Sequence, residues 1–396
     1  MLSSEVKRFI REHLDDDVRL LALRAASFPH PEIDFHFLLN QIAGRQQIKN
    51  KIPSWYPFDD IVYPPRLALE QCSSEATARY KASLLSGDSF VDLTGGWGVD
   101  TAFIAPHFVR AAYVEKQAGL SEIAAHNFSV LGLKHITVDT ADGVDYLRKM
   151  HPVDCIYLDP SRRSVSGRKV TLIEDCEPDL TRIQGYVPEK SRRALVKLSP
   201  MLDIRSALQT LKKVQAVHVV AHKNECKELL FLLDRKFEGE PLITCVDLKS
   251  GAENLTLTFN FTEEREATVV YTDSVGEYLY EPNVSLLKAG FYKTVALRYR
   301  LSKLHPDSHL YTSNEWAPHF PGRIFRVESV FSLNKRECKI PLAGTDRANI
   351  SVRNFPLTVA ELRKKLKLQE GGSIYLFATT LASGKRIIIK GESGKL

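Results

Sequence analysis

The chain has 396 residues, of which 44% are hydrophobic and 26% charged, and its 54 basic and 48 acidic residues give a formal net charge of +6. The length exceeds one ordinary hydrophobic core and predicts about two or three domains. The composition is that of a globular protein, which excludes a wholly disordered or fibrous chain. The mild basic excess is compatible with a polyanionic partner and equally with an enzyme of small molecules.

Two features bear on the compartment of the protein. No apolar run is long enough to cross a bilayer, and the charged N-terminus, MLSSEVKRFIREHLDDDVRLL, differs from a signal peptide. The six cysteines are scattered, without a CxxC pair or a histidine at zinc spacing, which favours free thiols in a reducing compartment. We therefore expect a cytoplasmic protein with no membrane partner and no metal.

Residues 1–68 are expected to form a helical domain. Val6, Phe9, Ile10 and Leu14 recur at helical spacing, and a second amphipathic pattern follows at 35–42. Residues 51–66 contain four prolines, which indicates a connector between this domain and the next.

Residues 69–265 alternate between short apolar runs and helical patterns. The runs are 90–94, 111–115, 135–138, 154–158, 194–198 and 216–220, and the helical patterns lie near 99–107, 119–131, 143–150, 178–185 and 203–212. This alternation predicts right-handed βαβ units and a parallel sheet covered on both faces. The gap between 216–220 and 226–233 is too short for a crossover helix, so this pair predicts an antiparallel hairpin. We expect an α/β, Rossmann-like sheet that ends in the hairpin.

The remaining chain divides into two smaller parts after the charged stretch 263–266. Residues 266–321 are expected to form a small linker or ferredoxin-like subdomain with a helical piece at 285–301 and a proline-rich loop. Residues 322–396 are expected to form a small α+β module, in which strands surround a basic helix at 358–368.

Glycines and carboxylates follow the first three predicted strands. The sequences are Asp92-Leu93-Thr94-Gly95-Gly96-Trp97-Gly98 after the first strand, Glu115-Lys116 after the second and Asp142-Gly143 after the third. Glycines at a strand-to-helix turn let the backbone approach a ligand beside helix N–H groups. A carboxylate after the second strand can accept both hydroxyls of a ribose, and Asp142 suits an adenine amino group. Each motif alone is weak, but three at successive strand ends predict a nucleoside cofactor.

With the terminal hairpin and the sequence after the fourth strand, these motifs resemble a class I S-adenosylmethionine-dependent methyltransferase over about residues 70–235. The resemblance implies that the turn Gly95-Gly96-Trp97-Gly98 passes under the methionine moiety, that Glu115 holds the ribose and that Asp142 caps the adenine. It also places Asp92, Thr94 and Lys116 at the cofactor. Thr94 stands where the family usually has its first glycine.

The turn before the first strand, residues 69–77, has two interpretations that the sequence leaves open. Ser73 or Ser74 is a suitable N-cap for the following helix. The methyltransferase resemblance instead implies a lip over the methionine carboxylate, with Gln71, Ser74 or Thr77 donating hydrogen bonds.

The fourth strand ends in Asp159-Pro160-Ser161, where nucleic-acid methyltransferases carry Asp-Pro-Pro-aromatic or Asp-Pro-Pro-Arg. The resemblance implies that Pro160 rigidifies the turn and that Asp159 accepts from an N–H group, which holds a nitrogen in line with the methyl donor. No aromatic residue follows to stack a flipped base. The arginines that follow resemble the form found in uridine C5 methyltransferases. The segment 197–201 lacks the cysteine those enzymes use, so covalent C5 chemistry is not expected.

A basic cluster adjoins the predicted reaction centre. Its residues are Arg162, Arg163, Arg168 and Lys169, and Ser199 after the fifth strand is expected to line the same pocket. These cations are suited to grip phosphates, although a basic cluster is more often a solvated surface.

The whole chain resembles a bacterial methyltransferase group with a helical N-terminal piece and a C-terminal THUMP-like domain. The matching segments are residues 70–74, 92–100, 158–163, 198–203, 280–283 and the terminal module through Lys385. THUMP domains are associated with structured RNA, which fits Arg363-Lys364-Lys365 and Lys367, although a solvated helix face would look the same.

The favoured hypothesis is therefore a methyltransferase of a base nitrogen in tRNA or rRNA. A small-molecule or protein substrate is the first alternative, and a non-catalytic RNA-binding relic is the second. The retained Asp92, Glu115, Asp142 and Asp159 argue against the relic.

Overall fold

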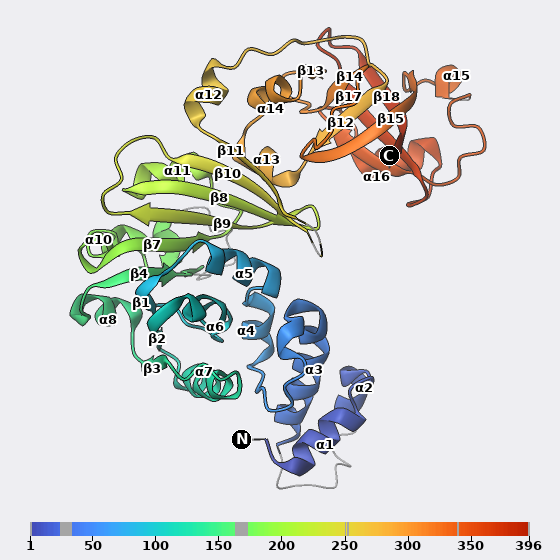
Figure 1. Cartoon of the computed structure of the whole chain (residues 1–396). Coiled ribbons are helices and arrows are strands. Elements are labelled where there is room, and N and C mark those ends of the chain that lie inside the picture. The colour runs from blue at the N-terminus through green and yellow to red at the C-terminus, as the bar shows by residue number, and fades with distance from the viewer. Residues whose placement is uncertain are drawn as a thin grey trace. The chain divides into compact units, whose positions relative to one another are not determined.

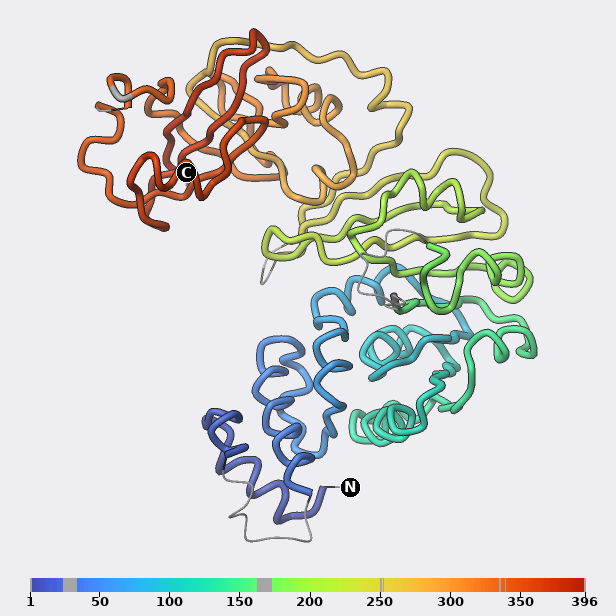
Figure 2. The backbone as a smooth tube through the Cα atoms, turned by 180° about the vertical axis from the view of Figure 1, so that it is seen from behind, coloured from blue at the N-terminus to red at the C-terminus, as the bar shows by residue number. Residues whose placement is uncertain are grey.

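The computed structural model describes residues 2–23, 34–162, 173–249, 251, 253–338 and 340–394 (Figure 1; Figure 2). The chain divides into two compact units, Met1–Val217 with Glu228–Gly239 and His218–Lys227 with Glu240–Leu396. Among the described helices, none combines the length and the apolar character needed to cross a bilayer.

The N-terminal segment is helical, as the sequence predicts. Its helices are α1 (Ser4–Glu12), α2 (Val18–Ala22), α3 (Phe35–Lys51) and α4 (Arg66–Gln71), with a 3₁₀ turn at Pro53–Trp55. Ser3 begins α1 by accepting a hydrogen bond from the N–H of Val6. The apolar faces of the first three helices bury Ile10, Leu21 and Leu38 in one cluster.

A nine-stranded sheet has the strand order β11-β10-β8-β9-β7-β4-β1-β2-β3. The strands are β1 (Gly87–Asp92), β2 (Phe108–Glu115), β3 (Ile136–Thr140), β4 (Val153–Leu158), β7 (Ser191–Leu198), β8 (Val214–His222), β9 (Glu225–Asp234), β10 (Leu242–Leu248) and β11 (Leu255–Phe259). β1 pairs in parallel with β2 and β4, β2 with β3, and β4 with β7, whereas β9 runs antiparallel to β7. The predicted parallel sheet is confirmed.

Helices connect these strands at the predicted patterns, and α10 is a further short helix that the sequence did not predict. They are α5 (Glu75–Ser83), α6 (Val99–Ile104) with a 3₁₀ turn at Ala105–His107, α7 (Ala118–Val130), α8 (Gly143–Lys149), α9 (Leu180–Ile183), α10 (Val187–Lys190) and α11 (Ile204–Thr210). Figure 1 shows α6 and α7 on one face of the sheet and α8 and α10 on the other. Right-handed crossovers require this arrangement because the chain reverses its direction across the sheet at β1, and ligands bind at such a reversal.

The predicted hairpin consists of β8 and β9, joined by Lys223 and Asn224. Both residues have positive φ angles, 52° and 57°, as in the two-residue turns that match strand twist. The sheet continues beyond this hairpin, because β10 lies next to β8 and β11 forms the edge. A separate pair, β5 (Ser161–Arg162) and β6 (Cys176–Glu177), follows the end of β4.

The second unit contains a seven-stranded sheet of order β13-β14-β12-β15-β18-β17-β16. Its strands are β12 (Tyr278–Pro282), β13 (Ser302–Lys303), β14 (Tyr311–Ser313), β15 (Gly322–Phe331), β16 (Asn349–Arg353), β17 (Ile374–Thr380) and β18 (Arg386–Ser393), and the helices are α12 (Phe261–Glu266), α13 (Val284–Ala289), α14 (Lys293–Arg298), α15 (Lys335–Cys338) and α16 (Val359–Leu366). The helical piece expected at 285–301 is two helices, because Gly290 ends α13 with a φ of 80°.

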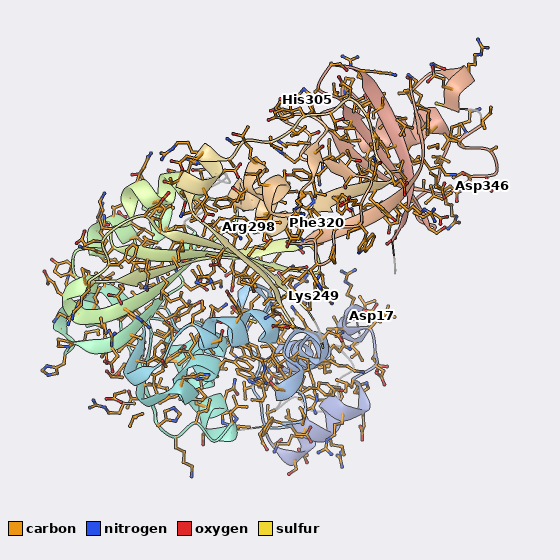
Figure 3. All side chains as sticks on the ribbon, turned by 45° about the horizontal axis from the view of Figure 1, so that its top comes forward. Asp17, Lys249, Arg298, His305, Phe320 and Asp346 are labelled. Carbon is orange, nitrogen blue, oxygen red and sulfur yellow. The ribbon has the colours of Figure 1, made fainter. Side chains whose placement is uncertain are left out.

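Aromatic side chains fill part of this second unit. Phe320, labelled in Figure 3, packs edge-on against Tyr280 and Tyr299, with ring centroids 5.1 and 5.4 Å apart. Phe325 and Phe377 form a similar pair at 4.7 Å in the neighbouring cluster. Such pairs add to the stabilisation from burial alone.

Candidate active site

The turn after β1 depends on close approach of its backbone to neighbouring side chains. A Cβ on Gly95 would lie 2.2 Å from the ring of Tyr113, and one on Gly98 would lie 2.7 Å from the ring of Phe128. Gly96 and Gly98 have φ angles of 56° and 83°, which glycine adopts without strain. All three glycines are therefore required by the geometry of the turn, whatever ligand it meets.

Glu115 ends β2 directly beside this turn. Its Oε2 accepts a hydrogen bond from the N–H of Gly96 at 2.9 Å, and its Oε1 accepts one from the N–H of Gln117 at 2.9 Å. Each carboxylate oxygen can accept a further bond, so Glu115 keeps capacity for two hydroxyl donors. Lys116, in contrast, is ion-paired with Glu177, with Nζ 2.7 Å from Oε1.

Asp142 begins α8 as its N-cap. Its Oδ1 accepts hydrogen bonds from the N–H groups of Val144 and Asp145, at 2.9 and 3.2 Å. The start of α8 lies against the end of β1, since a Cβ on Gly143 would come within 2.1 Å of the carbonyl oxygen of Leu93. Asp142 thus lies next to the glycine turn and can present Oδ2 to a ligand.

Asp92 stabilises the turn after β1 through two hydrogen bonds. Its Oδ1 accepts from the N–H of Thr94 at 2.9 Å and its Oδ2 from the hydroxyl of Thr101 at 2.6 Å. The residue is 1% exposed. Burial raises the pKa of Asp92 to about 7, although the hydrogen bonds from Thr101 and Thr94 oppose the shift.

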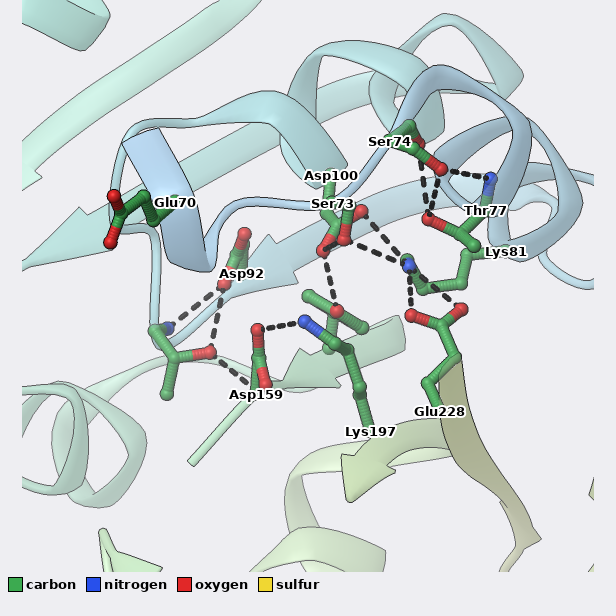
Figure 4. Close-up of polar contacts among 12 residues, drawn as sticks. Glu70, Ser73, Ser74, Thr77, Lys81, Asp92, Asp100, Asp159, Lys197 and Glu228 are labelled. Carbon is green, nitrogen blue, oxygen red and sulfur yellow. Dashed lines mark hydrogen bonds and ion pairs between the residues drawn. The ribbon is translucent and has the colours of Figure 1, made fainter. Parts of the chain in front are cut away.

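Asp159 follows β4 and is held at two points (Figure 4). Its N–H donates to the hydroxyl of Thr94 at 2.7 Å, which ties it to the turn after β1. The Nζ of Lys197, on β7, lies 2.5 Å from its Oδ2. The side chain of Asp159 is 34% exposed and that of Lys197 is 15% exposed. Pro160, the second predicted catalytic residue, is buried.

Lys197 remains protonated in this setting. Burial lowers its pKa, but the negative charges of Asp159, Asp100 and Glu228 outweigh burial and raise the pKa above its ordinary value. Lys197 is therefore an ammonium group at neutral pH, and it occupies Oδ2 of Asp159.

Lys81 lies at the centre of a buried charge network on the side of Lys197 away from Asp159 (Figure 4). Its side chain is 0% exposed, and its Nζ lies 2.9 and 2.8 Å from the two carboxylate oxygens of Glu228. The same Nζ lies 3.2 Å from Oδ1 of Asp100 and donates to the hydroxyl of Ser73 at 3.1 Å. Tyr157 donates to Oδ2 of Asp100 at 2.7 Å.

The two carboxylates of this network respond differently to burial. For Asp100, burial favours a higher pKa, but Lys81, Lys197 and the hydrogen bonds from Tyr157 and Ser73 outweigh it and lower the pKa. For Glu228, burial dominates over the attraction of Lys81 and raises the pKa. The pKa values of these two carboxyls are therefore shifted in opposite directions by the same surroundings.

The remaining residues of the predicted site lie at the following positions in the fold. Ser74 is the N-cap of α5, because its hydroxyl accepts from the N–H of Thr77 at 3.3 Å, so the capping interpretation is confirmed. Gln71 is the last residue of α4. The hydroxyl of Ser199 accepts from the N–H of Met201 at 3.2 Å. The backbone of Arg162 belongs to β5, whereas Arg163, Arg168 and Lys169 lie outside the described residues.

Lys81, Lys197 and Glu228 are site residues that the sequence motifs did not predict. Lys197 stands inside the otherwise apolar predicted strand ALVKL, and Glu228 directly precedes the apolar run of the predicted strand CKELLFLL. A charged residue within a buried strand requires a partner, and that requirement was a usable signal.

Two family models match consecutive segments in the last third of the chain. A ferredoxin-like domain model matches residues 278–321, and a THUMP domain-like model matches residues 322–392. An uncharacterized S-adenosylmethionine-dependent methyltransferase of Mycobacterium tuberculosis is 22% identical over 324 residues, which are 80% of this chain and 84% of that protein.

A crystal structure of a proposed methyltransferase from Porphyromonas gingivalis W83 matches nearly the whole chain. It is 35% identical, covers 99% of this chain and 98% of its own, and has a TM-score of 0.88. The chain belongs to the class I S-adenosylmethionine-dependent methyltransferases with a C-terminal THUMP-like domain. In this methyltransferase the turn after β1 and the ends of β2, β3 and β4 come together at one edge of the sheet, as the resemblance implied.

Proposed function

We propose that this methyltransferase transfers a methyl group from S-adenosylmethionine to a base nitrogen of structured RNA, either tRNA or rRNA. The observation that carries the proposal is the ion pair between Lys197 and Asp159 beside the glycine turn. Lys197 holds Oδ2 of Asp159, which leaves Oδ1 as an acceptor beside the turn, and an acceptor at that place selects an N–H donor.

The residues around the turn fit the cofactor. Glu115 retains acceptor capacity for the ribose hydroxyls, Asp142 presents Oδ2 to the adenine amino group, and the turn from Gly95 to Gly98 lies under the methionine moiety. Asp92 and Thr94 stabilise the turn that contacts the cofactor. The residues at the edge of the cofactor site are Gln71, Ser74, Thr77 and Lys116. Bound S-adenosylmethionine supplies an electrophilic methyl group on sulfonium.

Asp159 and Pro160 position the acceptor nitrogen. Because Oδ2 of Asp159 is held by Lys197, Oδ1 is the oxygen that accepts the substrate N–H. With S-adenosylmethionine bound, the methyl group would pass to this nitrogen and S-adenosylhomocysteine would leave, while Oδ1 of Asp159 or water would take the surplus proton. Holding the nitrogen in line makes the transfer effectively unimolecular, which can supply most of the catalysis.

RNA as the substrate is supported by the THUMP domain-like match at residues 322–392. We propose that Arg162, Arg163, Arg168 and Lys169 contact phosphates near the acceptor base, with Ser199 in the same pocket. We also propose the domain boundaries 1–68, 69–265, 266–321 and 322–396. All six cysteines are free thiols, which supports a cytoplasmic location.

A small-molecule or protein substrate is the second candidate. The observation that favours it is the sequence after Pro160, where Ser161 replaces the second proline of the motif and no aromatic residue follows to stack a flipped base.

The test is transfer of tritiated methyl groups from S-adenosylmethionine into total RNA of a strain lacking the gene. We expect label in one tRNA or rRNA species, lost with Asp159→Asn. Asp203→Asn, at the exposed N-cap of α11, makes the same chemical change and should retain activity. No label from a protein that binds the cofactor in calorimetry would overturn the RNA substrate. No cofactor binding would overturn the assignment of the turn.

A further inference from the structure

A cavity of about 960 Å³ lies in the second unit, between α16 and the strands β12, β15, β16 and β17. We call it the Glu281 cradle and define it by its charged lining residues Glu281, Arg323, Arg353, Arg363, Lys364 and Lys367, with Glu370 at the end of the helix. Nothing in the proposed methyl transfer uses it.

Glu281 organises the floor of the cradle. Its side chain is 4% exposed, its Oε2 accepts from Nε of Arg323 at 2.9 Å, and its Oε1 accepts from Arg353 at 3.1 Å. The hydroxyl of Ser351 donates to Oε1 at 3.2 Å. A buried carboxylate thus fixes two guanidinium groups, and each guanidinium has five N–H donors, more than this carboxylate takes up.

The cradle has an excess of positive charge. Five basic side chains line it against two acidic ones, a net charge of +3. Arg363 lies 3.9 Å from Glu370, which is largely exposed. Among the residues that the structure describes, Lys364 and Lys367 form no ion pair. Lys365, between them on α16, is not a lining residue, which divides the basic run into a lining part and an outer part.

Lys367 has an unusual backbone conformation for a lysine. It is the C-cap of α16, with a φ of 58°, in the left-handed region. Glycine is the usual residue there, because a side chain in that region destabilises the fold. A lysine at this position makes the fold less stable than a glycine would, but it places an ammonium group at the cradle.

The aromatic residue of the cradle is not open for stacking. The guanidinium of Arg323 lies over the ring of Tyr375, 5.5 Å from its centroid. Among the described lining residues, Tyr375 is the aromatic one. The cradle therefore offers charge-assisted donors rather than a platform for bases, and such donors suit phosphate oxygens.

We propose that the Glu281 cradle binds phosphates of the RNA substrate without reading its bases. This inference rests on the proposed function, in which the substrate is RNA. Arg353, Lys364 and Lys367 contact the phosphates, and Glu281 positions the arginines.

The test measures binding of the full-length protein to a fluorescent oligouridylate and to a tRNA transcript across a range of salt concentrations. Lys364→Gln/Lys367→Gln should weaken both complexes by about tenfold, and the slope of log K against log salt should fall by about 0.7 per lysine for the single strand. Lys365→Gln removes the same charge from the outer part of α16 and should bind as the wild type.

Lys367→Gly separates binding from folding. It should leave the Tm unchanged or raise it, and still weaken RNA binding. Equal binding by the Lys364→Gln/Lys367→Gln and Lys365→Gln proteins would overturn the cradle but leave the RNA methyltransferase standing. Failure of the wild type to bind either RNA would count against the proposed substrate. Binding of inorganic pyrophosphate in that case, lost with Lys367→Gly, would replace RNA by a small phosphate ligand.

Discussion

Lys197 and Asp159 form an ion pair, with Nζ 2.5 Å from Oδ2, although they are 38 positions apart in the chain. The pair joins β7 to the turn after β4, at the point where the reacting nitrogen is proposed to lie. Lys197 is therefore a positioning residue, which acts on the substrate through Asp159.

Lys197→Met tests this role. Without the ammonium, Asp159 loses its orientation, and we expect kcat to fall by about 100-fold because the acceptor nitrogen is no longer held in line. The affinity for S-adenosylmethionine should change little, because Glu115 and Asp142 have other partners. Single-turnover methylation and calorimetry measure the two quantities. Lys197→Arg keeps the positive charge and should restore part of kcat. A variant that loses cofactor affinity at unchanged kcat would contradict the assignment.

Lys81→Met should destabilise the first unit by about 3–5 kcal/mol, because it leaves Glu228 and Asp100 buried without their cation. Urea unfolding monitored by circular dichroism gives the change. The double variant Lys81→Met/Glu228→Gln should recover part of the loss. As a control, Arg66→Met breaks an exposed ion pair with Glu70 and should leave the unfolding midpoint unchanged. Equal midpoints for the Lys81 and Arg66 variants would show that the network contributes nothing to stability.

The pKa of Asp92 predicts a pH-dependent stability. Burial raises it from 3.8 to about 7 in the fold, so between these values the folded state binds more protons than the unfolded state. The contribution of Asp92 to stability is therefore largest below pH 4 and falls as the pH rises to about 7. Relative to Asp92→Asn, the wild type should lose up to about 4 kcal/mol of unfolding free energy between pH 4 and pH 8. Parallel pH curves for the two proteins would mean that Asp92 is ionised in the fold.

Gly95→Ala should abolish cofactor binding and lower the Tm, because its Cβ would lie 2.2 Å from the ring of Tyr113. Gly119 is the matched control. It lies in the first turn of α7 with nothing within 4 Å of an added Cβ, so Gly119→Ala should leave binding intact and stabilise the protein slightly. Calorimetry measures the cofactor affinity of both variants, and thermal unfolding measures their Tm. Cofactor binding by Gly95→Ala would show that the turn can relax.

The ends of the first four strands could be predicted from the sequence for a local reason. Strand, turn and helix signals follow one another within a few residues, so Asp92, Glu115, Asp142 and Asp159 could be placed at one edge of the sheet. The structure brings them together there, through the hydrogen bonds of Gly96 to Glu115 and of Asp159 to Thr94.

The buried network could not be predicted in the same way, because its contacts are not local. Lys81 and Glu228 are 147 residues apart, and they meet only because β9 is inserted beside β7. The helical spacing on α16 also could not show that Lys364 and Lys367 line the cavity whereas Lys365 does not. The lining of a cavity depends on the strands that face the helix, and these are distant in sequence.

The pairing of β12 with β15 has a consequence for how this part of the chain can be exchanged between proteins. The ferredoxin-like match ends at residue 321 and the THUMP domain-like match begins at residue 322, yet the two segments are hydrogen-bonded across one sheet, from Tyr278–Arg326 to Pro282–Gly322. Recombination that moved residues 322–392 alone would uncover the edge of β15, and an uncovered strand edge invites aggregation. The unit that can be exchanged between proteins without exposing a strand edge is therefore the whole seven-stranded sheet.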